Sequence, residues 1–262
     1  MFLRLAVAGF RRQSHYRLAM LAGLATNVVF GFIRAAILLA AVASAGGAIG
    51  GYRAGSMSTY VWLSQGLIGA VALFGWTEIS QRVRTGDIAV DLARPVDLQT
   101  AYLAADLGRA VYTFLPRGLP SVLIGAITVG LVLPSSPLPY LLGVMSILLG
   151  VAISFYCRFA INLVSFWLVE IRGVMSLYIV TASFLSGLYV PVHLFPHWLA
   201  SVAAATPFPS VLQTPIDVLS GYLTGADAWK AVGLQVVWLA VCGALGRLLM
   251  AAGHRKLVVQ GG

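Results

Sequence analysis

The sequence predicts an all-α integral membrane protein with six membrane-spanning helices, and three observations support this fold class. Of the 262 residues, 60% are hydrophobic and 10% are charged, whereas ordinary soluble domains are about 45–50% apolar and about 25% charged. Lipid solvates apolar helix surface that so few charges would leave exposed in a soluble fold. Apolar runs long enough to cross a bilayer recur along the chain, and the basic residues are distributed unevenly between the loops.

The apolar runs lie at residues 18–44, 56–80, 108–133, 138–160, 172–190 and 229–250. A membrane-spanning helix needs about 20 predominantly apolar residues, so the fifth run is near the lower limit. Turn-forming stretches separate the runs, AGGAIGGYRAGS after the first and PSSPLP after the third. Pro116 and Pro120 are expected to kink the third span, which neighbouring helices in a membrane can tolerate. We expect residues 1–262 to form a single transmembrane domain.

The N-terminal region resembles a signal peptide only superficially. Its first apolar run is longer than the 7–15 residues of an ordinary signal core, so we expect it to be retained as the first span. Residues 1–17 alternate apolar and basic groups. This pattern predicts a short amphipathic helix on the cytosolic membrane surface.

The basic residues predict the orientation of the chain. With the N-terminus inside, fourteen of the 17 Lys and Arg residues lie on the cytosolic side. They are Arg4, Arg11, Arg12, Arg17, Arg82, Arg84, Arg94, Arg109, Arg117, Arg158, Arg172, Arg247, Arg255 and Lys256. The outer side holds Arg53 and Lys230. Because basic loops stay in the cytosol, both termini are expected there, and the net charge of +9 reflects topology instead of nucleic-acid binding.

Arg34 is the one charge that this topology places deep inside a span. Such residues are costly in lipid and usually face a bundle interior or a water-filled cavity. Two interpretations remain open: a structural hydrogen bond to a neighbouring helix, or a position on a transport pathway.

The loop stretch GDIAVDLARPVD, Gly86–Asp97, is unusually charged for this chain. At 100° per residue its charged and apolar side chains fall on two different faces of a helix. The charged face comprises Arg84, Asp87, Asp91 and Arg94, and the apolar face Ile88, Ala89 and Leu92. A cap at Thr85 or Asp87 and a stop at Pro95 predict two to three helical turns. Periodicity alone is equally consistent with a simple interfacial helix.

Three stretches of the chain resemble a known family. RTGDIAVDLARPVDLQTAYLAADLGRA resembles the first cytoplasmic loop of ABC type-2 exporter permeases, in the bacterial branch with a GD and RPV motif. FLSGLYVPVHLFPHWLASVAAATPFPSVLQTPIDVLSG resembles that family's signature after the fifth span, and FWLVEIRG resembles the stretch entering that span. One departure is Ala93, where a Leu is usual and whose smaller side chain trims the apolar face.

The resemblance implies roles for three groups of residues. It implies a coupling helix between spans two and three, which docks on a separate ATPase. The residues of this helix are Arg84, Gly86, Asp87, Ile88, Asp91, Leu92, Arg94 and Pro95. It implies a substrate pathway at a permease dimer interface, with candidates Arg34, Phe184, Ser186, Gly187 and Pro191. It also implies short re-entrant helices between spans five and six, with candidates Phe195, Pro196, Trp198, Pro207, Phe208 and Pro215.

The energy source is expected to lie outside this chain. A P-loop needs a Gly-Lys pair followed by Ser or Thr, and neither Lys230 nor Lys256 follows a glycine. We therefore expect no enzyme activity, cofactor or metal here, and expect ATP and Mg to be bound by two partner ABC ATPase subunits. The resemblance further implies a second permease, identical or homologous, and location in the bacterial inner membrane.

Two other classes of membrane protein are alternatives, an ion-gradient carrier and a membrane-embedded enzyme. An ion-gradient carrier usually has acidic groups near mid-membrane, whereas Glu78 and Glu170 lie near cytosolic ends and Asp217 and Asp227 in the outer segment. A membrane-embedded enzyme would rely on the remaining candidate ligands, a pair of histidines in PVHLFPHW.

The residues His193 and His197 have the i,i+4 spacing of a helical metal site, but Pro196 interrupts the helix and no third ligand is evident. We interpret them as interfacial residues of an aromatic belt. Cys157 and Cys242 are interpreted as small buried hydrophobic residues. The substrate is not specified, although the scarcity of clustered charges favours an amphipathic or lipophilic compound.

Overall fold

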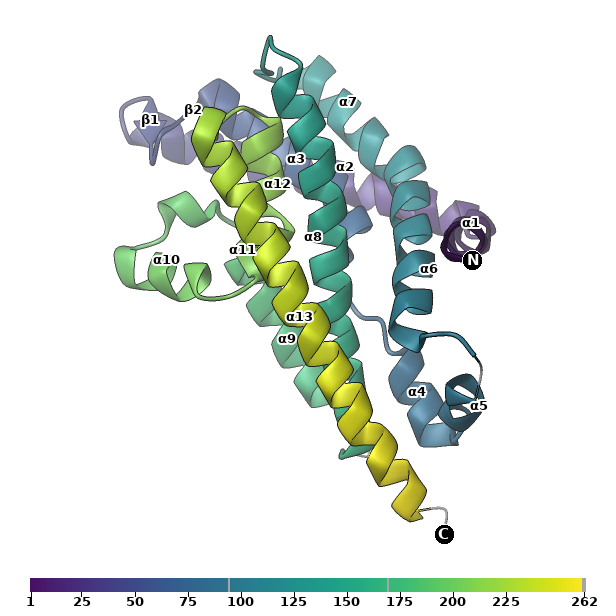
Figure 1. Cartoon of the computed structure of the whole chain (residues 1–262). Coiled ribbons are helices and arrows are strands. Elements are labelled where there is room, and N and C mark those ends of the chain that lie inside the picture. Colours follow the sequence, from purple (N-terminus) through teal and green to yellow (C-terminus); the bar gives the residue numbers. More distant parts are fainter. Residues whose placement is uncertain (94, 169, 261–262) are drawn as a thin grey trace.

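The computed structural model describes residues 1–93, 95–168 and 170–260, and these ranges are almost entirely helical (Figure 1). The α-helices are α1 (Phe2–Ser14), α2 (Arg17–Ser44), α3 (Ala54–Val71), α4 (Glu78–Thr85), α5 (Ile88–Leu92), α6 (Leu98–Thr113), α7 (Leu119–Thr128), α8 (Leu138–Leu163), α9 (Arg172–Leu185), α10 (His197–Ala204), α11 (Phe208–Val211), α12 (Gln213–Leu219) and α13 (Gly225–Gln260). A π-helix, η1 (Phe114–Gly118), and two 3₁₀ helices, η2 (Val164–Phe166) and η3 (Val192–Leu194), join them. Strands β1 (Ala48–Ile49) and β2 (Tyr52–Arg53) form a short antiparallel ladder.

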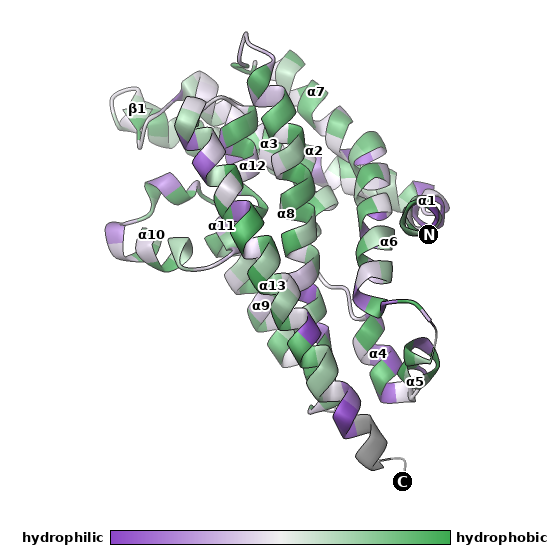
Figure 2. Ribbon diagram, in the orientation of Figure 1, coloured by the Kyte–Doolittle hydropathy of each residue, from purple (hydrophilic) through white to green (hydrophobic). Residues whose placement is uncertain are grey.

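Four helical segments are long and apolar enough to cross a membrane. They are Arg17–Ser44, Leu98–Thr128, Leu138–Phe166 and Gly225–Lys256, and they are predominantly hydrophobic in Figure 2. They coincide with the first, third, fourth and sixth predicted runs. The second run overlaps the 18-residue α3 and the fifth run contains the 14-residue α9, so the count of six spans stays a prediction.

Helix α3 forms the centre of the bundle. It contacts α2, α6, α7 and α8, and every residue from 57 to 67 is buried. The Trp62 side chain fits against Gly31 of α2 and Gly125 of α7, where a Cβ atom would collide with its ring. Several hydroxyl side chains of α3 find partners inside the bundle; Ser58 Oγ donates to the Gly130 carbonyl over 2.8 Å. Helix α3 is therefore surrounded by other helices of the protein.

The third predicted span is a composite of α6, η1 and α7, which follow one another as a bent column (Figure 1). Pro116 lies within the π-helical turn, and Pro120 lies in the first turn of α7. Because proline has no N–H and its ring clashes with the preceding turn, the wider π-helical turn accommodates it. The predicted perturbation by these two prolines therefore takes the form of a π-helical turn.

Helix α1 falls within the amphipathic segment predicted over residues 1–17. It packs along α6, and two glycines allow the backbones to approach closely. A Cβ on Gly9 would meet the backbone of Ala105, and one on Gly108 would meet the backbone of Ala6. Small residues at both contact points therefore hold α1 against α6, as at close helix crossings in membranes.

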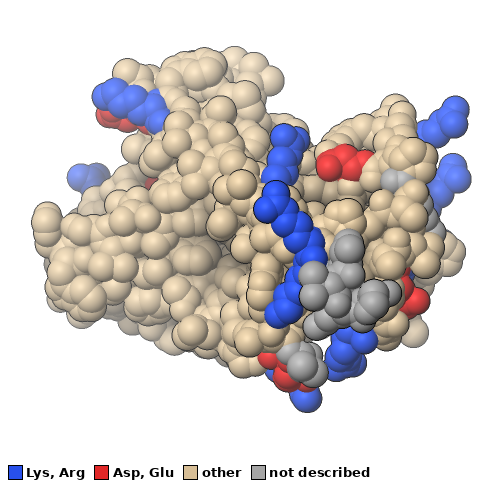
Figure 3. Space-filling model, turned by 60° about the horizontal axis from the view of Figure 1, so that its bottom comes forward, with Lys and Arg blue, Asp and Glu red and all other residues tan. Residues whose placement is uncertain are grey.

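The two ends of the bundle differ in character. Helices α4 and α5 and the C-terminal end of α13 lie together at the bottom of Figure 1, while the loop between α7 and α8 lies at the top. Seen from the bottom end, Lys and Arg side chains form a row across the surface (Figure 3). The end bearing α4 and α5 is therefore the one that the sequence assigns to the cytosol.

Candidate functional site

The Gly86–Asp97 stretch forms a shorter helix than the periodicity predicts. Helix α4 ends at Thr85, Gly86 adopts φ 82°, and α5 covers only five residues, Ile88–Leu92. A left-handed residue redirects the chain, so Arg84 lies on α4 and does not share a helical face with Asp87 and Asp91. Arg94 lies outside the described residues.

One face of α5 is anchored inside the protein. Ile88 is fully buried in an apolar cluster that includes Phe155 and Phe159 of α8, and Leu92 packs against the same cluster. Asp91 is also buried, and its carboxylate accepts a hydrogen bond from Nε of Arg82. This hydrogen bond raises the pKa of the Arg82 guanidinium.

The opposite face of α5 is exposed. Asp87, Ala89 and Pro95 are exposed, and the Val90 side chain is 58% exposed. Asp87 accepts a 2.8 Å hydrogen bond from Thr85 Oγ1, which holds the turn between α4 and α5. The face thus combines one carboxylate with apolar surface.

Asn162 of α8 ties this region to the membrane-spanning bundle. Its Nδ2 donates to the carbonyl of Trp76 over 2.7 Å, and its Oδ1 accepts from the backbone N–H of Ser80 over 3.2 Å. The start of α4 is therefore joined to α8 by both polar and apolar contacts. A displacement of α4 and α5 cannot leave α8 unaffected while these contacts last.

A surface cleft of about 290 Å³ lies beside α4. At its rim Glu170 approaches Arg84 at 3.9 Å and Arg172 at 2.9 Å. The Arg172 hydrogen bond lowers the pKa of the Glu170 carboxyl. Two stretches that resemble exporter permeases, the loop around Arg84 and the sequence FWLVEIRG, thus meet at one place.

Arg34 of α2 is half-buried, and its side chain contacts α3. Its Nη1 donates to Ser64 Oγ over 2.6 Å. Its Nε and Nη2 atoms are buried, and neither has a hydrogen-bond partner among the described residues. The contact with Ser64 supports a structural role for Arg34. The two unpartnered donors support a position on a transport pathway.

The other pathway candidates do not form one site. Phe184 is 40% exposed and stacks on Phe195 with ring centroids 5.1 Å apart. Ser186 is buried, and Gly187, with φ 83°, accepts a 2.7 Å hydrogen bond from Tyr60 through its carbonyl. Pro191 N-caps η3. Ser186 and Gly187 thus belong to the core near α3, whereas Phe184 faces outward.

The segment between α9 and α13 contains the short helices α10, α11 and α12, and their re-entrant position in the membrane stays a prediction. Pro196 and Pro207 precede α10 and α11 as their N-cap residues. Trp198 is 67% exposed on α10, which projects from the side of the bundle in Figure 1. Phe208 packs on Tyr178 with centroids 6.0 Å apart, while Pro215 is buried in α12.

A buried polar network that the sequence did not reveal joins the outer segments. Asp217 is 2% exposed and contacts His193 Nε2 at 2.8 Å and Gln213 Nε2 at 2.8 Å. Burial raises the pKa of Asp217. The Tyr222 ring stacks on His193 with centroids 4.6 Å apart. His193 is thus held by a carboxylate, and among the described residues no group of three His, Cys, Asp or Glu is arranged to hold a metal.

A second missed feature is an ionic cluster inside two candidate spans. Asp106 of α6 accepts from Arg109 Nε over 2.7 Å and from Arg158 Nη2 of α8 over 2.8 Å. Arg109 also donates to the carbonyls of Gly69 and Ala70 at 3.0 and 2.9 Å. The only signal in the sequence was the position of these charges at the edges of apolar runs, because the pairing spans 52 residues.

The comparison with protein families matches most of the chain. A family described as ABC-2 family transporter protein matches residues 30–261, a range that holds the second half of α2 and all later elements. No curated protein and no solved structure matches the chain. The matched range confirms the resemblance to ABC type-2 permeases. The chain therefore belongs to the ABC-2 transporter family, as a helical membrane permease.

Proposed function

We propose that this chain is the transmembrane subunit of an ATP-driven exporter. Two permeases, identical or homologous, form the substrate pathway between them, and two separate ABC ATPase subunits bind ATP and Mg. The complex lies in the bacterial inner membrane with both permease termini in the cytosol. Family membership supports the transporter class, and the fourteen-to-two distribution of basic residues supports the orientation.

The observation that carries the proposal is the two-sided construction of the Gly86–Asp97 segment. Ile88 and Asp91 are buried against the bundle, while Asp87 and Val90 are exposed. A segment that only lay on the membrane would need an apolar outer face, without a carboxylate and its hydrogen-bonded turn. An exposed carboxylate beside apolar surface matches the complementary contacts of a protein partner.

The proposed mechanism follows from how this segment is mounted. Closure of the ATPase subunits on ATP moves α4 and α5, which are joined to α8 through Asn162 and the Phe155–Phe159 cluster. Helix α8 packs along α13 and against α12. Motion at the cytosolic end is thereby carried to the outer segment, where the short helices α10 to α12 cap the pathway.

Arg34 is proposed as a pathway residue for its donors, unpartnered in the described part of the chain, and Phe184 for its exposed side chain. Arg34 has two unpartnered donors among the described residues, and Phe184 stacks on Phe195 at the exposed edge of α9. These groups line the proposed dimer interface. Ser186, Gly187 and Pro191 shape the turn that leads into the outer segment.

An ion-gradient carrier is a weaker alternative. Asp106 is an acidic group within a candidate span, as such a carrier requires. Its carboxylate is occupied by Arg109 and Arg158 at 2.7 and 2.8 Å. Because two arginines already compensate this carboxylate, it has no free position for a transported cation. These contacts favour a structural role for Asp106.

The experiment that tests the proposed function is co-purification of the full-length chain from its native membrane. A P-loop ATPase should be recovered with the permease and should hydrolyse ATP in the purified complex. The ATPase should be lost from the Asp87→Arg variant while the permease remains in the membrane. Recovery of the chain without any P-loop ATPase, by gentle extraction and cross-linking alike, would refute the proposal.

A further inference from the structure

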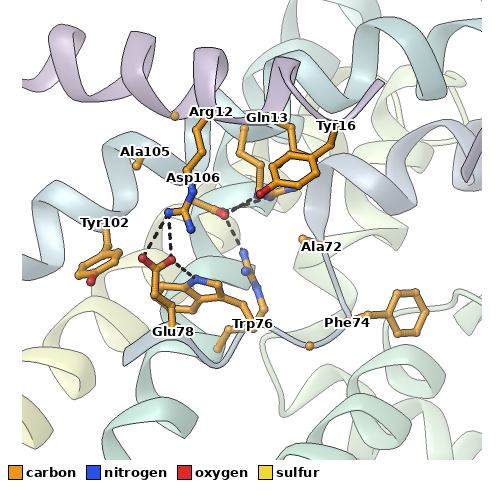
Figure 4. A pocket seen from close by; sticks show the side chains of 14 residues that line it. Arg12, Gln13, Tyr16, Ala72, Phe74, Trp76, Glu78, Tyr102, Ala105 and Asp106 are labelled. Atoms are coloured by element: carbon orange, nitrogen blue, oxygen red, sulfur yellow. Dashed lines mark hydrogen bonds and ion pairs between the residues drawn. The ribbon is translucent and has the colours of Figure 1, made fainter. Parts of the chain in front are cut away.

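A cleft of about 380 Å³ lies where α1, α6, α8 and the α3–α4 connection meet. Arg12 of α1 reaches towards Glu78 from one side, and Tyr102 and Asp106 of α6 lie near them (Figure 4). Arg158 of α8 also lines this cleft. Nothing in the proposed coupling mechanism uses this space.

The charges around the cleft do not balance. Arg12 pairs with Glu78 over 3.2 Å. Asp106 is shared by Arg109 and Arg158, so these two guanidinium groups face one carboxylate. The cleft therefore carries an excess positive charge on a buried group, and burial of an uncompensated charge is unfavourable.

Arg158 is the group in the cleft that a bound anion would compensate. Its side chain is 1% exposed, and its Nε has no hydrogen-bond partner among the described residues. Its guanidinium carbon lies 5.9 Å from the centroid of the Trp76 ring, which compensates the charge only in part. An unpartnered N–H on a buried cation is the kind of donor that an oxyanion satisfies.

The remaining walls suit a molecule with both a polar and an apolar part. Tyr16 and Tyr102 line the cleft together with Gln13, and these side chains offer hydrogen bonds to a headgroup. Phe74 lines the same cleft, points away from the ion pairs in Figure 4 and is 47% exposed. An acyl or other apolar chain can lie along this surface while the headgroup stays among the arginines.

We propose that this cleft binds the oxyanion headgroup of an amphipathic molecule, which enters beside α1 from the cytosolic leaflet. The headgroup pairs with Arg12 at the rim and with the unpartnered Nε of Arg158 inside. The side of entry rests on the proposed function, whereas the binding chemistry does not. The occupant is either an anionic bilayer lipid or a transported anionic amphipath, since both present the same headgroup chemistry.

The test is a titration of the purified full-length chain in a neutral detergent with dodecyl phosphate, followed by calorimetry. Dodecyltrimethylammonium serves as the cationic probe with the same apolar chain. Arg12→Gln should weaken dodecyl phosphate binding about tenfold, because a hydrogen bond to a charged group is lost. Arg11→Gln, with the same change in charge on the same helix but outside the cleft, should bind as the wild type does.

A second variant addresses the cleft itself. Gly75 lines the cleft and a Cβ there would meet nothing within 4 Å, so Gly75→Leu adds a bulky side chain to the cleft wall without displacing backbone. It should abolish saturable binding of dodecyl phosphate and leave thermal stability unchanged. Equal binding of the two probes, or equal behaviour of Arg12→Gln and Arg11→Gln, would overturn the proposal.

Two further measurements separate the sources of the ligand. Phosphatidylglycerol that is retained in preference to phosphatidylcholine, and displaced by dodecyl phosphate, identifies a bilayer lipid. Stimulation of ATP hydrolysis by dodecyl phosphate in the complete complex, dependent on Arg12, identifies a transported amphipath. The titration needs no ATPase, so a failure of ATPase recovery refutes the proposed function without affecting this result.

Discussion

Arg158 of α8 donates from Nη2 to Oδ2 of Asp106 in α6 over 2.8 Å, with only 1% of the Arg158 side chain exposed. Arg109 donates to the other carboxylate oxygen over 2.7 Å. This ionic contact joins two candidate spans, Leu98–Thr128 and Leu138–Phe166. It also explains why α6 begins ten residues before the apolar run at residues 108–133. The charged Asp106 in this first part of α6 is stabilised by contacts with other protein groups, so this part of the helix does not need only lipid-compatible side chains.

The first prediction is that Asp106→Asn destabilises the bundle. Removal of one partner from a buried ion pair costs about 3–5 kcal/mol, because the remaining charge is left uncompensated. Thermal unfolding of the purified protein should occur at a clearly lower temperature. Asp227→Asn removes the exposed pair with Lys230 and should change the unfolding temperature little. Equal effects of the two variants would contradict a structural role for Asp106.

The second prediction concerns the exposed face of α5. Asp87→Arg reverses a surface charge and should reduce ATPase recovery while the unfolding temperature stays at the wild-type value. Asp91→Arg should instead lower the unfolding temperature, since Asp91 is buried beside Arg82. The amount of co-purified ATPase and the unfolding temperature are measured for both variants. These measurements check that Asp87 acts in partner binding and Asp91 in stability. Loss of stability in Asp87→Arg would show that this residue is structural.

The third prediction concerns the turn at Gly86. Its φ of 82° is unfavourable for residues with a Cβ by roughly 1–2 kcal/mol, and more so for β-branched ones. Gly86→Val should therefore reorient α5 and reduce the permease-dependent stimulation of ATP hydrolysis. Gly173→Val, at a helical glycine in open space without positive φ, is the matched control. Normal stimulation in Gly86→Val would exclude a requirement for this turn geometry.

The fourth prediction distinguishes the two interpretations of Arg34. If its free donors line the pathway, Arg34→Gln should lower ATP-driven export of an amphipathic dye while assembly and thermal stability are retained. Ser64→Ala removes the hydrogen-bond partner of Arg34 Nη1 and should leave export largely intact. A variant that fails to accumulate in the membrane, with its loss matched by Ser64→Ala, would establish the structural interpretation.

The fifth prediction tests the topology. In a background without Cys157 and Cys242, cysteines at Arg53 and Asp227 should react with an impermeant thiol reagent added to intact cells. A cysteine at Asp87 should react only after the membrane is permeabilised. All three positions are exposed in this chain, so burial within the permease does not explain a difference. Labelling of Asp87 in intact cells would invert the orientation.

The sequence by itself determined the membrane class and the positions of four long helices. The runs at 18–44, 108–133, 138–160 and 229–250 coincide with candidate spans in the structure. This succeeds because transfer of an apolar helix into lipid depends on its own side chains and length, which are local properties. The resemblance to exporter permeases was equally local, since its motifs are continuous stretches.

The tertiary structure decided which polar residues are satisfied and where the functional surfaces lie. Periodicity placed Arg84, Asp87 and Asp91 on one charged face, but the turn at Gly86 separates Arg84 from the other two. Asp91 is buried beside Arg82, whereas Asp87 is exposed. The pairs Asp106–Arg158 and His193–Asp217 join residues on different elements, so neither appears in any single run. A buried charge is stable only beside a partner, and the identity of that partner is set by packing between distant helices, which local residue patterns do not contain.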